Sequence, residues 1–307
     1  PRHVTELFAL LANANKTSKV LDICAGTGGF LISAMHRMFK SATTEAERTA
    51  IKSSGLVGVE QQPNMFALAA SNMILRGDGK ANLYQGSCFD DAIAKAIKAH
   101  QCDIGMVNPP YSQSDSDLHE LRFVKHMLDC LKEKGVGIAI VPMSCALNAD
   151  SLRAEILKEH PLEAVMSMPD QLFYPVGTVT CIMIFTAHIP HHVSNKKTWF
   201  GYWKNDGFVK TKNKGRIDQN LTWESIRNRW VEAFRNREVH PGESVMMHVD
   251  AEMEWGAEAY MDTDYALIQQ QTYEAAVRDY AIYRMLGQTN SSNLDESDVV
   301  EVIGDDK

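Results

Sequence analysis

Short apolar runs alternate with longer stretches of helical periodicity over most of the first 190 residues. The apolar runs fall at residues 19–23, 56–60, 82–85, 103–108, 137–141, 163–167 and 179–185, and each predicts a strand. The most regular helical patterns cover residues 29–39, 43–52 and 63–76. The last of these begins at Pro63 and stops at Gly77, residues typical of a helix start and a helix end. This alternation predicts an α/β fold around a mostly parallel sheet.

The last two strand runs are joined through Tyr174-Pro-Val-Gly177, a link too short for a crossover helix. It therefore predicts an antiparallel hairpin. After residue 191 the pattern changes, because residues 196–216 hold seven basic side chains against one acid, Asp206, with aromatic residues between them. The aromatic residues are Trp199, Phe200, Tyr202, Trp203 and Phe208. Two interpretations stay open: a surface that contacts DNA phosphates, or a solvated lysine-rich hairpin with a packed aromatic face.

Helical patterns return at residues 222–235 and 266–285, and residues 290–307 are polar with six acids against one lysine. We therefore divide the chain at residues 190 and 290. The expected parts are an α/β domain over residues 1–190, a basic and helical region over residues 191–290, and a flexible acidic tail over residues 291–307.

Composition excludes several classes of protein. The 307 residues are 45% hydrophobic, and the longest apolar runs are about half the roughly 20 residues of a membrane-spanning helix. Six scattered cysteines without a C-x-x-C pair exclude a zinc framework and a small disulfide scaffold. We expect a cytoplasmic protein with reduced thiols and no bound metal. The net charge of −8 is unsuited to a nucleic-acid binder that acts alone.

A glycine-rich turn follows the first strand. It reads Asp22, Ile23, Cys24, Ala25, Gly26, Thr27, Gly28, Gly29 and Phe30. Glycines let the backbone bend sharply and approach a ligand, and the next helix offers free N–H groups. Leu31 stands where a dinucleotide fingerprint needs a third glycine or alanine. Glu60 ends the next strand, where an acid accepts hydrogen bonds from ribose hydroxyls, so the pattern favours a nucleoside ligand over a bare strand–helix turn.

A second motif, Asn108-Pro109-Pro110-Tyr111, ends the fourth strand at the carboxyl edge of the sheet. Two prolines fix the backbone and remove two donors, which leaves carbonyl groups aimed outward. Asn108 adds a side-chain carbonyl and Tyr111 an aromatic face. Such a turn suits a planar amide or an exocyclic amine, although a plain turn at a strand end is the alternative.

These two motifs, together with residues 58–60 and 72–77, resemble those of S-adenosylmethionine-dependent DNA adenine-N6 methyltransferases. The likeness is greatest to the modification (methylase) subunit of type I restriction–modification systems, which residues 172–178 and 206–218 also resemble. The resemblance covers about residues 1–220. It implies a Rossmann-like methyltransferase fold, with a seven-stranded, mostly parallel sheet and an antiparallel last strand. A β-hairpin and helices would follow as a C-terminal appendage.

The resemblance also implies how S-adenosylmethionine is held. Asp22 and the loop after it would surround the methionine and ribose portions; the loop residues are Cys24, Ala25, Gly26, Thr27, Gly28, Gly29 and Phe30. Glu60, followed by Gln61, would hold the ribose hydroxyls. The turn of Ser87, Cys88 and Phe89 would meet the cofactor adenine. Related enzymes carry an acid in that turn; here Ser87 stands in and Asp90 comes later, so backbone groups near Cys88 and the Phe89 ring are expected to replace it.

For the target base, the resemblance implies that Asn108 and the Pro109 carbonyl accept the adenine N6 hydrogens, with Pro110 fixing the turn and Tyr111 stacking on the ring. A paired adenine is out of reach, so the base must be flipped out of the duplex. The implied partners are double-stranded DNA, reached through a specificity subunit that reads the sequence, and a restriction subunit.

Two other functions remain open: methylation of another planar nitrogen, such as a protein glutamine amide or an RNA base, and a non-catalytic assembly subunit. The start at Pro1-Arg2-His3-Val4 resembles the end of a family F-Y-T-P segment. Either an initiator Met was removed before Pro1, or the chain is the excised core of a longer subunit without its N-terminal helical domain, and we favour the excised core.

Overall fold

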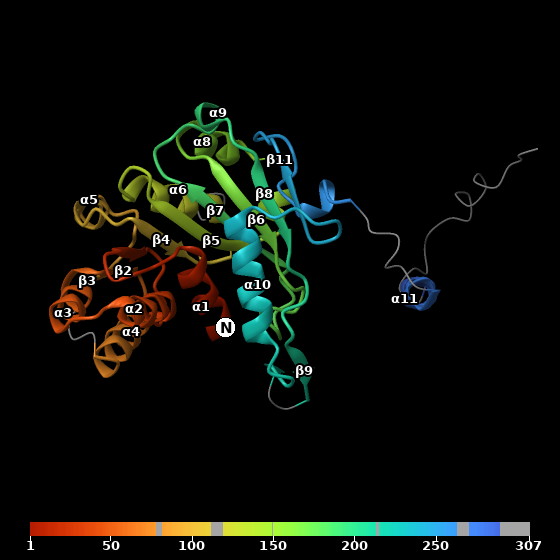
Figure 1. Cartoon of the computed structure of the whole chain (residues 1–307), viewed down its shortest axis with the longest axis horizontal. Helices are drawn as coiled ribbons and strands as arrows, with labels where there is room; N and C mark the ends of the chain where they lie inside the picture. Colours follow the sequence, from red (N-terminus) through yellow and green to blue (C-terminus); the bar gives the residue numbers. More distant parts are fainter. Residues whose placement is uncertain (78–81, 112–118, 149, 213–214, 263–269, 289–307) are drawn as a thin grey trace, which may run out of the picture. The chain divides into compact units, whose positions relative to one another are not determined.

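The structure, a computed structural model, describes residues 1–77, 82–111, 119–148, 150–212, 215–262 and 270–288. The chain separates into two compact units, residues 1–262 and 263–307. The described part of the second unit is helix α11 (Gln270–Gln288). The first unit is a twisted sheet with helices on both faces (Figure 1). None of the helices in the described part of the chain is long and apolar enough to cross a membrane.

The main sheet has nine strands in the order β11-β8-β6-β7-β5-β4-β1-β2-β3. The strands are β1 (Val20–Asp22), β2 (Leu56–Glu60), β3 (Asn82–Gln85), β4 (Ile104–Val107), β5 (Val136–Pro142), β6 (Leu162–Ser167), β7 (Thr180–Thr186), β8 (Thr198–Tyr202) and β11 (Ser244–Met247). Strand β7 lies antiparallel between β5 and β6, and β1 to β5 pair in parallel. The mostly parallel α/β fold and the antiparallel seventh strand are therefore confirmed.

The expected number of seven strands is wrong, because β8 and β11 extend the sheet beyond β6. Strand β8 pairs in parallel with β6, and β11 pairs antiparallel with β8. The physical reason is burial: Trp199 and Phe200 are fully buried, one on each face of the sheet. The aromatic residues thus form a packed strand, and the expected boundary at residue 190 falls between two strands of one sheet. A separate hairpin pairs β9 (Val209–Thr211) with β10 (Gly215–Ile217).

Helices cover both faces of the sheet, and strand alternation divides the core. Along β5, Ile138 and Ile140 belong to one buried cluster, and Ala139 and Val141 to the other. The first cluster includes residues of α1 (Arg2–Leu11), α2 (Gly29–Ser41), α3 (Glu45–Ser54), α4 (Pro63–Leu75) and α10 (Trp223–Asn236). The second includes residues of α5 (Asp91–Ala99), α6 (Glu120–Cys130), α7 (Ser144–Leu147) and α8 (Ser151–Glu159), while α9 (His191–Ser194) has no buried residue.

Helix α1 is an element that the hydrophobic pattern did not reveal. It packs between α2 and α10, and the Phe8 ring lies 4.5 Å from that of Phe30, measured between centroids. The guanidinium of Arg235 in α10 donates a hydrogen bond of 2.9 Å to the carbonyl of Leu10. The predicted acidic tail, residues 291–307, lies outside the described residues.

Candidate active site

The predicted site residues follow the carboxyl ends of adjacent strands. Strand β1 pairs with β2 on one side, where Asp22 is opposite Gly58, and with β4 on the other, where Leu21 is opposite Gly105. Residues 24–28, here called the glycine loop, therefore emerge beside Glu60 and beside residues 108–111, here called the N-P-P-Y turn. Open α/β sheets bind ligands at this edge.

The glycine loop is shaped by two left-handed residues. Gly26 has φ +54° and Gly28 has φ +84°, values that glycine adopts without strain. The Gly28 amide donates to the Ala25 carbonyl at 2.7 Å, which closes the turn. A Cβ atom on Gly26 would meet nothing within 4 Å, so a ligand has room against this stretch of backbone. The Asn72 side chain on α4 donates to the Thr27 carbonyl at 3.0 Å and holds the loop from outside.

Helix α2 begins directly after the loop. Gly29 is its first residue and Gly28 its N-cap, so the free N–H groups of the first turn lie at the loop. The Phe30 side chain points the other way, since its ring is buried against Phe8. Phe30 therefore anchors the helix start, and its backbone is the part nearest the loop.

Asp22 is the most unusual charged group of the site. Its side chain is fully buried; one oxygen accepts the Cys24 amide at 3.0 Å, and the other has no partner among the described residues. Burial is the main cause that raises the pKa of Asp22 to about 7; the Cys24 amide opposes it and the Glu60 charge adds to it. A buried, unpaired carboxylate oxygen is a ready partner for a cationic ligand.

Glu60 joins three parts of this edge. One of its carboxylate oxygens accepts the Gly26 amide at 2.8 Å, and the other accepts the Gln62 amide at 2.8 Å. Its carbonyl accepts the Gly86 amide at 3.0 Å, which draws in the turn after β3. Each carboxylate oxygen keeps a second lone pair, so Glu60 retains capacity for hydroxyl donors. Gln61 is exposed beside it.

The turn of residues 87–89 lies next to the glycine loop, because the Cys24 and Cys88 thiols are close enough to affect each other's ionisation. This interaction is the main cause that raises the pKa of Cys24 and lowers the pKa of Cys88. Ser87 Oγ accepts the Phe89 amide at 3.3 Å. Asp90 caps α5 by accepting the amides of its first turn, so its carboxylate is engaged away from the loop.

The Phe89 ring has a stable support. It lies edge-on to Phe123, with centroids 4.9 Å apart, yet 38% of its side chain stays exposed. The His126 ring nitrogen lies 2.7 Å from the Cys88 carbonyl oxygen and helps to hold this turn in place. This arrangement offers an aromatic face where the sequence lacks the usual acid.

The residues of the N-P-P-Y turn differ in exposure. Asn108 and Pro110 are exposed, whereas Pro109 is buried, and the Asn108 amide makes no hydrogen bond within the described part of the chain. Tyr111 is half-buried; burial raises the pKa of its hydroxyl, which has no described partner. The Phe173 ring stands perpendicular to the Tyr111 ring at 6.4 Å and 85°. Phe173 was not among the predicted site residues, although the family-like segment 172–178 contained it.

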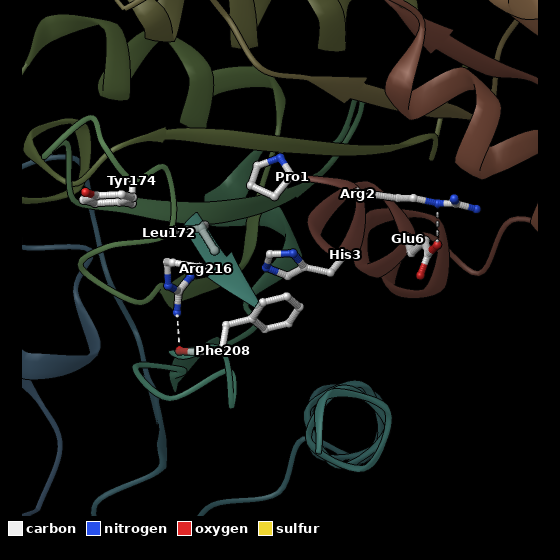
Figure 2. A pocket seen from close by; sticks show the side chains of 8 residues that line it. All are labelled: Pro1, Arg2, His3, Glu6, Leu172, Tyr174, Phe208 and Arg216. Atoms are coloured by element: carbon white, nitrogen blue, oxygen red, sulfur yellow. Dashed lines mark hydrogen bonds and ion pairs between the residues drawn. The ribbon is translucent and has the colours of Figure 1, made fainter. Parts of the chain in front are cut away.

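A cavity of about 460 Å³ lies between the start of α1, the β6–β7 loop and the β9–β10 hairpin. Figure 2 shows its lining residues: Pro1, Arg2, His3, Glu6, Leu172, Tyr174, Phe208 and Arg216. The His3 ring stacks on Phe208 at 4.1 Å, and His3 Nε2 lies 3.5 Å from a carboxylate oxygen of Asp206. Tyr174, the neighbour of Phe173 in sequence, forms the opposite wall.

Two curated relatives share this part of the chain. The Type II restriction enzyme and methyltransferase RM.BcgI of Heyndrickxia coagulans is 41% identical over 227 residues, or 71% of this chain and 35% of that protein. The Type I restriction enzyme StySPI methylase subunit of Salmonella potsdam is 26% identical over 210 residues, or 61% of this chain and 39% of the subunit. The chain thus spans well under half the length of these relatives.

Solved structures have the same fold. The type I methyltransferase subunit from Streptococcus thermophilus superposes with a TM-score of 0.63 at 20% identity, over 80% of this chain and 55% of that one. The M protein of the EcoKI type I restriction enzyme gives 0.61 at 18% identity, over 74% and 52%. The family model described as N-6 DNA Methylase matches residues 1–275, and the chain belongs to this family.

Proposed function

We propose that this chain transfers the methyl group of S-adenosylmethionine to N6 of an adenine flipped out of duplex DNA. One observation carries the proposal: Asp22 and Asn108 lie at the carboxyl ends of the adjacent strands β1 and β4, and within the described residues one Asp22 oxygen and the Asn108 amide have no hydrogen-bond partner. Membership in the N-6 DNA Methylase family supports the same reaction.

The donor set fits the proposed cofactor. S-adenosylmethionine carries a cationic sulfonium and an ammonium group, which suit the unpaired oxygen of Asp22. Its ribose hydroxyls suit the remaining lone pairs of Glu60, and its adenine suits the exposed Phe89 ring and the backbone of residues 87–88. When bound, this cofactor supplies an electrophilic methyl group.

The N-P-P-Y turn would hold and activate the acceptor. The Asn108 side-chain carbonyl and the Pro109 backbone carbonyl accept the two N6 hydrogens, so the nitrogen lone pair is directed toward the methyl carbon. Tyr111 stacks on the base, and the perpendicular Phe173 ring supports the Tyr111 ring. The lone pair forms the new C–N bond as the C–S bond breaks toward sulfur, and N6 then releases one proton to solvent. Positioning supplies most of the rate enhancement.

Base flipping costs about a few kcal/mol, which stacking of the base on Tyr111 helps to offset. The net charge of −8 opposes tight DNA binding by the chain alone. We therefore place the chain in a restriction–modification assembly, in which a DNA-recognising partner provides most of the DNA affinity. Both curated relatives are named as restriction enzymes or their methylase subunits, which supports this setting.

The test is a methyl-transfer assay with labelled S-adenosylmethionine and duplex DNA, read as N6-methyladenine by mass spectrometry. We expect Asn108→Ala to lower the transfer rate at least about a hundredfold, because it removes a carbonyl that acts on the reacting nitrogen. Cofactor affinity should stay unchanged, since the glycine loop is intact.

Asn236→Ala is the matched control, because Asn236 is an exposed amide near the opposite edge of the sheet, bonded to Glu238 at 3.0 Å. It should behave as wild type. Transfer by Asn108→Ala at the wild-type rate would refute the assigned mechanism. Methyl incorporation into protein or RNA, with none in DNA, would refute the substrate.

A further inference from the structure

The basic segment of residues 196–216 does not form one continuous cationic surface. Arg216 is bound to the buried Asp206, and a guanidinium nitrogen lies 3.0 Å from the carboxylate. Lys204 pairs with Asp170 at 2.9 Å, and Lys196 lies 3.7 Å from Glu163. Half of the six basic residues that the structure describes here are therefore neutralised by acids, while Lys214 lies outside the described residues.

Lys210 has a different partner. Its ammonium lies 4.1 Å from the centroid of the Tyr174 ring, and its side chain is exposed. A cation over an aromatic face keeps its full charge and can still meet an anion. Lys210 is held by the hairpin, because it pairs in register with Arg216, the residue anchored to Asp206. The pKa of Asp206 is raised by burial but lowered more by the nearby His3 and by the hydrogen bonds from Arg216, so this anchor is ionised.

The Lys210–Tyr174 pair is linked to the candidate base site through the chain. Tyr174 directly follows Phe173, whose ring faces Tyr111, and Tyr174 is 41% exposed on the wall of the cavity in Figure 2. The acids nearby are already paired: Glu6 with Arg2 at 3.2 Å, and Asp170 with Lys204. An anion at Lys210 would therefore meet little opposing charge from Glu6 or Asp170.

We propose that Lys210 and Tyr174 form a subsite for the backbone of the DNA strand beside the flipped adenine. Lys210 binds a phosphate, and the Tyr174 ring packs against the adjoining sugar. This subsite rests on the proposed function and deepens it, because it assigns the strand contact to one end of the basic segment. The other end, with Lys196 and Lys197, precedes β8 at the amino end of β6 and lies at the opposite edge of the sheet.

The experiment compares Lys210→Gln with Lys197→Gln in the full chain, using a fluorescein-labelled duplex at several salt concentrations. Both variants remove one exposed lysine charge from the same segment. Loss of one phosphate contact lowers the slope of log affinity against log salt by about 0.9. We expect that change for Lys210→Gln and none for Lys197→Gln. Tyr174→Leu should raise the KM for DNA several-fold with little change in kcat.

Cofactor affinity, measured by calorimetry, reports whether each variant is folded and should be unchanged in all three. Equal salt slopes for Lys210→Gln and wild type, or no DNA binding by wild type even at low salt, would overturn the subsite. Failure of the proposed function looks different, because wild type itself would then form no N6-methyladenine. A subsite that fails alone would leave wild-type transfer and its dependence on Asn108 intact.

Discussion

Asp22 connects burial to ligand binding at the scale of one residue. A carboxylate at the end of a buried strand loses its hydration, and a single amide donor from Cys24 does not replace it. The pKa of about 7 means that the free chain holds a substantial fraction of protonated Asp22 at neutral pH. A cationic ligand favours the ionised form, so proton release and ligand binding are linked.

This linkage predicts a pH dependence of S-adenosylmethionine affinity. Above the pKa of about 7 Asp22 is ionised before the ligand arrives, and affinity should be flat. Below it, binding must first remove the proton, and the dissociation constant should rise by up to about tenfold per pH unit. Calorimetry between about pH 6 and pH 8 measures this.

Asp22→Asn should bind more weakly and lose the added dependence, whereas Asp91→Asn, an exposed acid on α5, should keep the wild-type profile. The ligand's own amino group also titrates, but it affects wild type and both variants equally, so the difference between their pH profiles reports Asp22 alone. An unchanged profile in Asp22→Asn would show that another group carries the dependence.

Sequence alone located most of the candidate site residues but not their contacts. Asp22, Glu60 and Asn108 were placed because each ends or directly follows a strand, which apolar runs make visible. The Tyr111–Phe173 contact was not foreseen, since it depends on how residues 168–178 run between β6 and β7. The roles assigned to these residues remain predictions, and the experiments above test them.

At the scale of elements, one buried arginine joins segments that are distant in sequence. Arg153 on α8 is fully buried and donates to the carbonyls of Cys145 at 3.1 Å and Met253 at 2.9 Å. It also bonds the carbonyls of Ala146 and Ala251, and its guanidinium lies 4.6 Å from the Trp255 ring centroid. Burial lowers the pKa of Arg153 from its usual value. This side chain fastens residues 250–257 to α7.

We therefore expect Arg153→Met to lower the free energy of unfolding by about 3 kcal/mol or more, because several buried carbonyls lose a charged donor. Urea denaturation measures the change. Arg229→Met is the control: Arg229 pairs with Glu243 at 3.3 Å on the surface, and its loss should cost within about 0.5 kcal/mol. A loss below about 1 kcal/mol for Arg153→Met would contradict this role.

The elements themselves differ in how visible they were in the sequence. Strands β1 to β7 lie within a few residues of the apolar runs, because strands buried on both faces read as continuous hydrophobic stretches. Strand β8 did not stand out as part of the sheet, since lysines flank its aromatic residues and its partner β6 lies more than 30 residues earlier. Strand β11 depends in turn on β8.

At the scale of the whole molecule, the packed core ends well before the chain does. Both buried clusters lie within residues 4–257, and β11 forms one edge of the main sheet. Helix α11 belongs to the second unit. Its Tyr273, Val277 and Tyr280 recur at helical spacing and are each more than half exposed in the chain alone.

This division predicts that residues 1–262 fold without the rest. The shortened chain should keep the wild-type urea midpoint and the wild-type affinity for S-adenosylmethionine, because the glycine loop, Glu60 and both clusters remain. Denaturation followed by fluorescence suits the test, since all five tryptophans lie before residue 262. A lower midpoint or a lost cooperative transition would mean that the second unit stabilises the first. An unchanged midpoint would leave the exposed apolar face of α11 available for a role outside the methyltransferase fold. Comparing the DNA affinity of the shortened chain with that of the full chain would then measure how much residues 263–307 contribute to DNA binding.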